Sequence, residues 1–173
     1  MVDSPLYPVN LRVAGRSCLV VGGGTVAADK VQGLSDARAA VTVVAPEFAD
    51  ALIARHDIHR IRRAYHPDDL DGRWLVVTAT DDPVVNARVA ADATERRIWV
   101  NSADDPRNCS FTLPARVRRG DLLIAISTGG RSPAMASWVR RWLEGELGPE
   151  HDRLLDVLAA VREELRADGI ATE

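Results

Sequence analysis

A glycine pattern near the N-terminus is the strongest chemical signal in the sequence. Gly22, Gly24 and Ala27 form a G-x-G-x-x-A pattern that directly follows the apolar residues 18–21. The first glycine permits a tight turn, the second lets the backbone approach a pyrophosphate, and the small third residue lets a helix pack closely on a strand. The helix N-terminus would then face the phosphate. The pattern predicts a dinucleotide site, although a strand-to-helix turn without a ligand would use the same residues.

Two further positions belong to the same predicted site. The apolar residues 41–45 end at Pro46 and Glu47, where a carboxylate is expected to bond the ribose hydroxyls of NAD. Glu47 lies slightly late for this role, and no arginine adjoins it in the sequence to favour a 2′-phosphate, so we expect NAD rather than NADP. Thr80 follows another apolar run and is a candidate cofactor contact, or else an ordinary cap or turn residue.

A carboxylate beyond the last apolar run of this half could handle protons. Asp104 follows the predicted strand at residues 98–100, where it would lie near the nicotinamide end of a bound cofactor, and it is our first choice for an acid or base. The competing interpretation is a solvated loop carboxylate before Pro106. The histidines and the two cysteines have no metal-ligand spacing.

A second glycine-rich loop could bind anions. Thr128, Gly129, Gly130 and Arg131 precede a predicted helix, and such a loop offers backbone N–H groups beside a guanidinium. We expect Arg131 to hold carboxylates of a polyanionic ligand. Arg107 and Arg116 are weaker candidates, and scattered surface arginines remain the simpler interpretation of all of them.

The order of elements predicts how these residues are positioned. Apolar strands alternate with helices up to residue 100, which predicts an α/β, Rossmann-like, doubly wound parallel sheet. Its first helix, at residues 26–34, should turn Val26, Val31 and Leu34 inward. The predicted strands are residues 18–21, 41–45, 58–63, 74–78 and 98–100, and the later helices are residues 48–55 and 84–96.

The pattern changes after residue 100. Residues 110–117 and 121–127 flank a hairpin-like turn, which indicates antiparallel strands, and helices are predicted at 134–145 and 149–166. We therefore expect a nucleotide-binding domain at 1–113, a small α+β dimerisation and substrate module at 114–149, and the start of a C-terminal helical segment at 150–173. The hairpin and the apolar face of the last helix expose more apolar surface than a monomer can hide, which predicts a homodimer.

Composition limits the function classes. Charged residues make up 27% of the 173 residues and the net charge is −3, so nothing draws the chain to nucleic acid or to a membrane surface. No apolar run approaches the length of a membrane span, and no basic region followed by an apolar stretch opens the chain. Two cysteines make no disulfide framework, so we expect a reducing, cytoplasmic location.

Taken together, these stretches resemble the precorrin-2 dehydrogenase module of siroheme synthesis, which occurs alone or at the N-terminus of multifunctional siroheme synthases. The glycine motif is shared with many dehydrogenases, but its combination with NSADDP, SFTLPA and STGGRSP is specific to that family. The matching stretches cover nearly all of residues 7–150 and read YPVNLRVAGRSCLVVGGGTVAADKV, VTVVAPE, TATDD, VNSADDPRNCSFTLPARVRRG and DLLIAISTGGRSPAMASWVRRWLE.

The resemblance implies NAD-dependent oxidation of precorrin-2 to sirohydrochlorin by a homodimer, with ferrous iron insertion as an added activity of some members. It also implies that Asp104 is the catalytic carboxylate. Thr128 stands where some members carry a serine that can be phosphorylated, and the family usually extends further in helices. A non-catalytic NAD- or tetrapyrrole-binding module is the alternative. By motif, the cofactor contacts are Gly22, Gly23, Gly24, Thr25, Val26, Pro46, Glu47 and Thr80.

Overall fold

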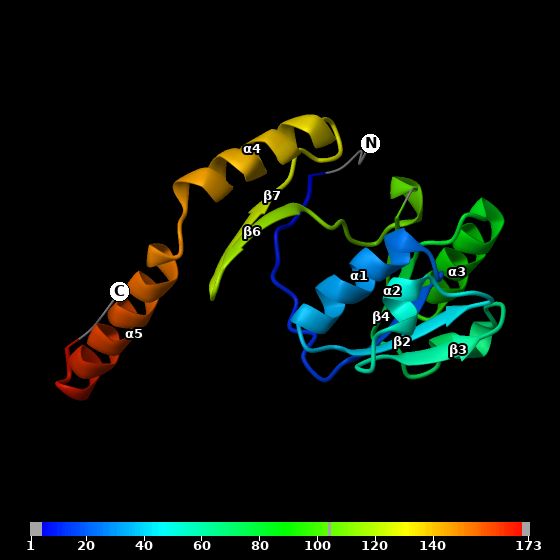
Figure 1. Ribbon diagram of the computed structural model, residues 1–173, viewed down its shortest axis with the longest axis horizontal. Helices are drawn as coiled ribbons and strands as arrows, with labels where there is room; N and C mark the ends of the chain where they lie inside the picture. The colour runs from blue at the N-terminus through cyan, green and yellow to red at the C-terminus, as the bar shows by residue number, and fades with distance from the viewer. Residues whose placement is uncertain (1–4, 104, 171–173) are drawn as a thin grey trace. The chain divides into compact units, whose positions relative to one another are not determined.

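A computed structural model describes residues 5–103 and 105–170 of the chain. These residues form two compact units that divide between Leu113 and Pro114. The first unit contains a sheet with helices and the second a hairpin with two long helices (Figure 1). Each unit is described separately below.

The first unit is built on a five-stranded parallel sheet in the order β3-β2-β1-β4-β5. Its central strands consist mainly of valine and leucine and are buried, as expected of strands covered on both faces. The chain runs outward from β1 to β3 and then returns to the other side of β1. The strands are β1 Ser17–Val21, β2 Ala40–Ala45, β3 His59–Arg62, β4 Leu75–Thr78 and β5 Trp99–Ser102.

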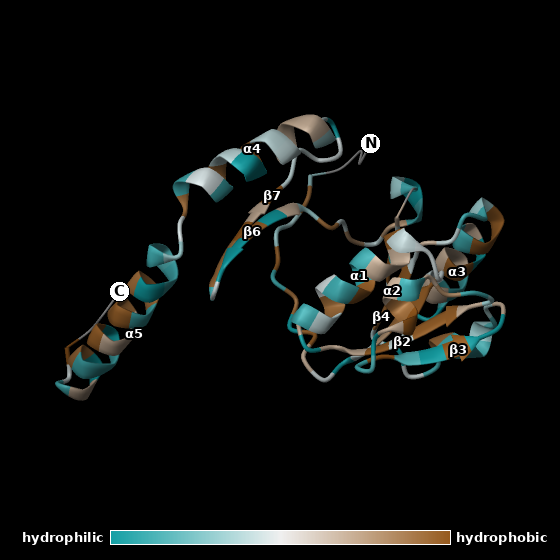
Figure 2. Ribbon diagram, in the orientation of Figure 1, coloured by the Kyte–Doolittle hydropathy of each residue, from teal (hydrophilic) through white to brown (hydrophobic). Residues whose placement is uncertain are grey.

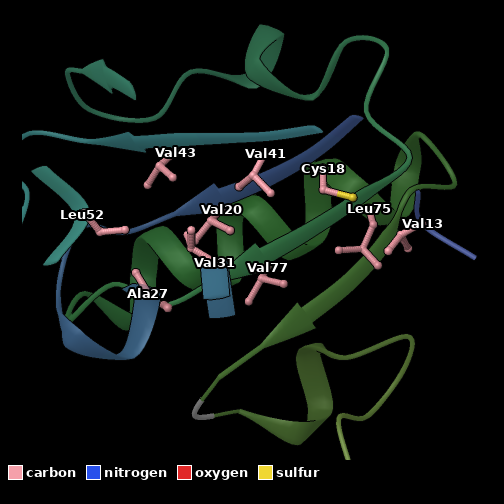
Figure 3. Close-up of a cluster of buried hydrophobic side chains, with 11 residues drawn as sticks. Val13, Cys18, Val20, Ala27, Val31, Val41, Val43, Leu52, Leu75 and Val77 are labelled. Carbon is pink, nitrogen blue, oxygen red and sulfur yellow. The ribbon is translucent and has the colours of Figure 1, made fainter. Parts of the chain in front are cut away.

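Two apolar clusters fill the two faces of this sheet. Val20 lies in the first cluster with Ala27 and Val31 of α1, as Figure 3 shows, whereas Leu19 lies in the second with Val89 of α3. Because neighbouring residues of a strand point to opposite faces, the two clusters show that helices cover both sides. The doubly wound Rossmann-like fold expected from the sequence is confirmed. The helical segments are α1 Thr25–Asp36, α2 Asp50–Ile53, the 3₁₀ turn η1 Pro67–Leu70, α3 Pro83–Glu95 and the 3₁₀ turn η2 Pro106–Asn108.

Two local predictions in this unit were wrong. Val26 does not point inward: 45% of it is exposed, while Ala27 and Val31 are fully buried. Residues at positions i and i+4 share a helix face, so Ala27 and Val31 form the buried stripe and Val26 lies beside it. In addition, β5 continues through Ser102 instead of ending at Val100.

The second unit begins with an antiparallel hairpin. Its strands, β6 Ala115–Arg119 and β7 Leu122–Ile126, confirm the predicted hairpin, and Gly120 takes the positive φ that its turn requires. The expectation that the first strand starts at residue 110 was wrong. Ser110 instead donates its N–H to the carbonyl of Val100 at 2.8 Å, which ties this segment to β5.

Two helices complete the second unit. Pro133 occupies the first turn of α4 (Pro133–Glu146), and the Ser132 hydroxyl caps it by accepting from the N–H of Met135. The helix α5 (Glu150–Ala167) follows Pro149. Arg119 links the hairpin to the C-terminal end of α4, since its guanidinium donates to the carbonyls of Leu147 and Glu144.

Both helices of this unit expose apolar side chains. Trp138 and Trp142 stack with ring centroids 6.4 Å apart, and each is more than half exposed. Apolar residues also recur along α5 in Figure 2. The large exposed apolar side chains of α5 are Leu154, Val157, Leu158 and Val161. No described helix has the length and apolar character needed to cross a membrane.

Candidate functional site

A pocket of about 660 Å³ lies at the carboxyl ends of the parallel strands in the first unit. It is formed by the segments that follow β1, β2, β3 and β4. The strand order reverses between β1 and β4, and open α/β sheets bind ligands at such a reversal. The lining residues are Val21, Gly22, Gly23, Gly24, Val44, Ala45, Pro46, Glu47, Phe48, Ala49, Ala64, Tyr65, Ala79, Thr80, Asp81, Asp82 and Val85.

Gly22 makes the tight turn after β1. Its φ is +127°, a backbone conformation that L-residues with a side chain rarely adopt. A Cβ at this position would overlap the carbonyl oxygen of Ala79 and lie 2.6 Å from its carbon. The turn thus needs glycine for two independent reasons. One is its positive φ, and the other is that the end of β1 packs against the backbone that follows β4.

Gly23 has a packing role that the motif alone does not reveal. A Cβ there would overlap the carbonyl oxygen of Glu47 and lie 2.9 Å from the Cβ of Ala45. Its carbonyl accepts a 2.8 Å hydrogen bond from the N–H of Ala49. These contacts fasten the segment after β2 to the glycine turn and so shape the wall of the pocket.

Gly24 is different, because a Cβ there would meet nothing within 4 Å. It is the N-cap of α1, in an ordinary extended conformation, and it has no side chain to accept from the first amides of the helix. An open backbone at a helix N-terminus suits a phosphate group. Thr25 and Val26 begin the helix just beyond the lining residues.

Thr80 is held in place by Asn86, a buried residue that the sequence analysis did not single out. The side-chain amide of Asn86 accepts from the N–H of Thr80 at 3.2 Å and donates to its carbonyl at 2.9 Å. The Thr80 hydroxyl donates to Asn86 Oδ1 at 2.8 Å. The cap of α3 is Asp82, whose carboxylate accepts from the N–H groups of Val84 and Val85. Thr80 is therefore a positioned turn residue that lines the pocket.

The residues after β3 also line the pocket and were not foreseen. Tyr65 donates its hydroxyl to a carboxylate oxygen of Asp92 at 3.0 Å. Burial, together with that carboxylate, raises the pKa of Tyr65 well above its usual value, so the phenol stays neutral. The signal available in the sequence was position alone, because Ala64 and Tyr65 lie within three residues of the end of β3, a strand parallel to β2.

The candidate catalytic residue Asp104 lies outside the described residues. Of its neighbours in the sequence, Ala103 donates its N–H to the carbonyl of Thr78 at 2.9 Å. Asp105 caps η2 and pairs with Arg107 at 3.2 Å, which lowers the pKa of Asp105 through a side-chain hydrogen bond. Cys109 accepts from the N–H of Ser102 at 3.2 Å.

The second glycine-rich loop lies in the second unit, before α4. Thr128 braces it, since its hydroxyl accepts from the N–H of Ser132 at 3.1 Å. Gly129 and Gly130 both have positive φ, and Arg131 is exposed. The structure thus brings these four candidates together in one loop, while Arg116 lies in β6 and Arg107 in the other unit. Within residues 5–103 and 105–170, no group of three or more histidine, cysteine or acidic residues could hold a metal ion.

Comparison with known proteins agrees with this geometry. A family model described as "Putative NAD(P)-binding" matches residues 9–115, and one described as "Sirohaem biosynthesis protein central" matches residues 119–146. A solved structure titled "SirC, precorrin-2 dehydrogenase" superposes with a TM-score of 0.77 at 31% identity, covering 93% of this chain and 81% of that one.

Curated relatives point the same way. A siroheme synthase of Thioalkalivibrio sulfidiphilus is 40% identical over 93% of this chain, and one of Methylobacillus flagellatus is 40% identical over 92%. The chain spans about a third of the length of these relatives, 34% and 35%.

The fold, the glycine turn and the family model together define an NAD(P)-binding domain. More narrowly, the chain belongs to the siroheme-synthesis family that contains siroheme synthases and precorrin-2 dehydrogenase.

Proposed function

We propose that this chain oxidises precorrin-2 to sirohydrochlorin with NAD as the oxidant. The observation that carries the proposal is the pocket at the strand-order reversal, with an open glycine at a helix N-terminus, in a chain that is 31% identical to a precorrin-2 dehydrogenase over 93% of its length. Siroheme synthases of similar sequence support the same activity.

In this proposal the first unit holds the cofactor. Gly24, Thr25 and Val26 present backbone N–H groups to the pyrophosphate, and Gly22 and Gly23 keep the turn narrow enough for it to approach. Pro46 and Glu47 lie beside the adenosine ribose, where the Glu47 carboxylate favours NAD. The part of the pocket wall that contains Thr80 borders the nicotinamide half of the cofactor. Bound NAD would accept a hydride from the reduced macrocycle. Asp104 would take up the proton that the macrocycle releases, so that the ring gains one double bond.

The second unit is proposed to hold the substrate. Precorrin-2 is a polycarboxylate, and Arg131 with the N–H groups of Gly129 and Gly130 offers carboxylate donors in a loop braced by Thr128. Arg116 in β6 is a secondary candidate, as is Arg107, which belongs to the first unit. Arg131→Ala should raise the KM for precorrin-2 while the Kd for NAD stays unchanged, and Arg153→Ala on α5 is the control for loss of charge. An equal loss of affinity for both ligands would withdraw the substrate assignment.

We also propose a homodimer formed by the second unit. The exposed Trp138 and Trp142 pair and the apolar side chains along α5 are surfaces that a second copy would cover. Sedimentation at micromolar concentration should give a dimer, and a monomer alone would contradict the assignment.

Two free thiols support a cytoplasmic location.

The decisive experiment mixes the purified full chain with NAD and precorrin-2 and follows NADH absorbance. Oxidation above a protein-free control supports the proposal. No NADH from a folded protein would refute it, and tight binding of NAD and sirohydrochlorin without turnover would support a non-catalytic binding module instead.

A further inference from the structure

Beside the pocket, one arginine lies where the sequence analysis found none. Arg62 is the last residue of β3, and it pairs in register with Ala45, the last residue of β2. Its guanidinium lies 5.5 Å from the ring centroid of Phe48, the residue directly after Glu47. Arginine and the proposed ribose-binding carboxylate are thus neighbours in the fold although fourteen intervening residues (48–61) separate them in the sequence.

Phe48 gives the guanidinium a fixed platform. The ring is partly buried against the apolar cluster of the first unit and also lines the pocket. A guanidinium that lies over the face of a ring keeps its N–H groups, which point outward in its own plane, free to bind other groups. Arg62 is exposed and does not itself line the pocket, but it contacts Phe48, which does, and this contact puts its guanidinium beside the pocket wall.

The other arginines of this strand region are already engaged. Arg60 donates to the carbonyls of Leu52 and Arg55, and Arg63 forms a two-point ion pair with Asp69. Within the described part of the chain, Arg62 has only its ring contact and no carboxylate partner. Its charge therefore serves no structural pairing among those residues.

The charge of the pocket itself is negative. Glu47, Asp81 and Asp82 line it, and its described lining contains no lysine or arginine. A ligand with an additional phosphate near Glu47 would need a cation at the border, and Arg62 is such a cation. An arginine near the end of the second strand is the feature by which Rossmann-like domains accept an adenosine 2′-phosphate.

We propose that Arg62 makes this a site of dual cofactor specificity, binding the 2′-phosphate of NADP while Glu47 serves the ribose hydroxyls of NAD. This inference rests on the proposed dinucleotide function of the same pocket. A guanidinium–phosphate contact is charge-assisted and often two-pronged, so its loss should weaken NADP binding by roughly tenfold to a hundredfold.

Isothermal titration of the full chain with NAD and with NADP, without substrate, tests the proposal. The wild-type chain should bind NADP within about tenfold of NAD. In Arg62→Ala the Kd for NADP should rise at least about tenfold, while the Kd for NAD changes less than about threefold. Added salt should weaken NADP binding to the wild type more steeply than to the variant.

Arg16→Ala is the matched control. Arg16 also stacks on a ring, that of Trp74 at 5.8 Å, but it precedes β1 and so lies at the amino edge of the sheet, opposite the pocket. The substitution removes the same charge and the same kind of contact, and it should alter neither Kd. Thermal melting of both variants verifies that they are folded.

The outcomes separate the two proposals. If NAD binds and NADP does not, or if Arg62→Ala keeps the wild-type affinity for NADP, the inference about Arg62 is wrong and the proposed NAD-dependent function stands. If neither dinucleotide binds to the folded wild type, both proposals are overturned. Selective loss of NADP affinity in Arg62→Ala establishes the inference.

Discussion

Substitution by alanine should have different effects at two glycines of the turn after β1, lowering stability at Gly22 and NAD affinity at Gly24. In Gly22→Ala the new methyl group meets the carbonyl of Ala79, and the backbone must keep a φ of +127° or rearrange. A residue forced into such a region costs about 1–3 kcal/mol, and relief of the overlap adds to this, so we expect a loss of at least about 3 kcal/mol in unfolding free energy.

Gly24→Ala should leave stability nearly unchanged. The φ of Gly24 is −83° and nothing lies within 4 Å of the added Cβ, so only the weaker capping ability of alanine counts, less than about 1 kcal/mol. The methyl group would, however, occupy the open side of the turn where we propose that the pyrophosphate approaches. We expect the Kd for NAD to rise at least about tenfold.

Urea unfolding followed by circular dichroism measures the first effect. With a urea slope of about 1–3 kcal/mol/M, a 3 kcal/mol loss lowers the midpoint by roughly 1–3 M. Isothermal titration with NAD measures the second effect. A Gly22→Ala midpoint equal to that of the wild type would refute the close packing of β1 on β4, and unchanged NAD affinity in Gly24→Ala would refute the proposed approach of the pyrophosphate.

Three further predictions follow from buried polar groups. Burial by itself would raise the pKa of Asp69, but its hydrogen bonds from Arg63 and from the N–H of His66 outweigh burial and lower the pKa, so its contribution to stability is present above its unfolded pKa and is lost as pH falls through the lower folded value. In urea unfolding, Asp69→Asn should cost about 1–2 kcal/mol at pH 7, and a gap to wild type that does not narrow as the solution is acidified would argue against the charge. Asn86→Ala leaves the Thr80 backbone unpaired and should cost about 2 kcal/mol by the same assay, with an unchanged midpoint as the contrary result. Cys18 is fully buried, and burial raises its pKa to about 11 against the opposing charge of Arg73, whereas Cys109 is only partly buried. A thiol reagent at pH 8 should therefore label the native protein at Cys109 alone, and native labelling of a Cys109→Ser variant would contradict this.

Sequence reasoning was strongest where the physical cause is local. The turn at Gly22 and Gly24 and the buried strands around it follow from apolar runs and from glycine's backbone freedom, which depend on adjacent residues only. The hairpin about Gly120 follows for the same reason, and the structure confirms it. The prediction that Val26 points inward was also wrong for a local reason. An error of one position in assigning the buried residues of a helix puts the wrong side chain on its buried face.

The surroundings of the pocket required the tertiary structure. Gly23 is needed because the carbonyl of Glu47 packs against it, and Thr80 is held by Asn86. Arg62 reaches Phe48 only because β3 pairs with β2. A parallel sheet brings the carboxyl ends of strands together regardless of how far apart they lie in the chain. The sequence by itself therefore determined the elements and the glycine turn, whereas the pairing of the strands decided which side chains meet at the pocket.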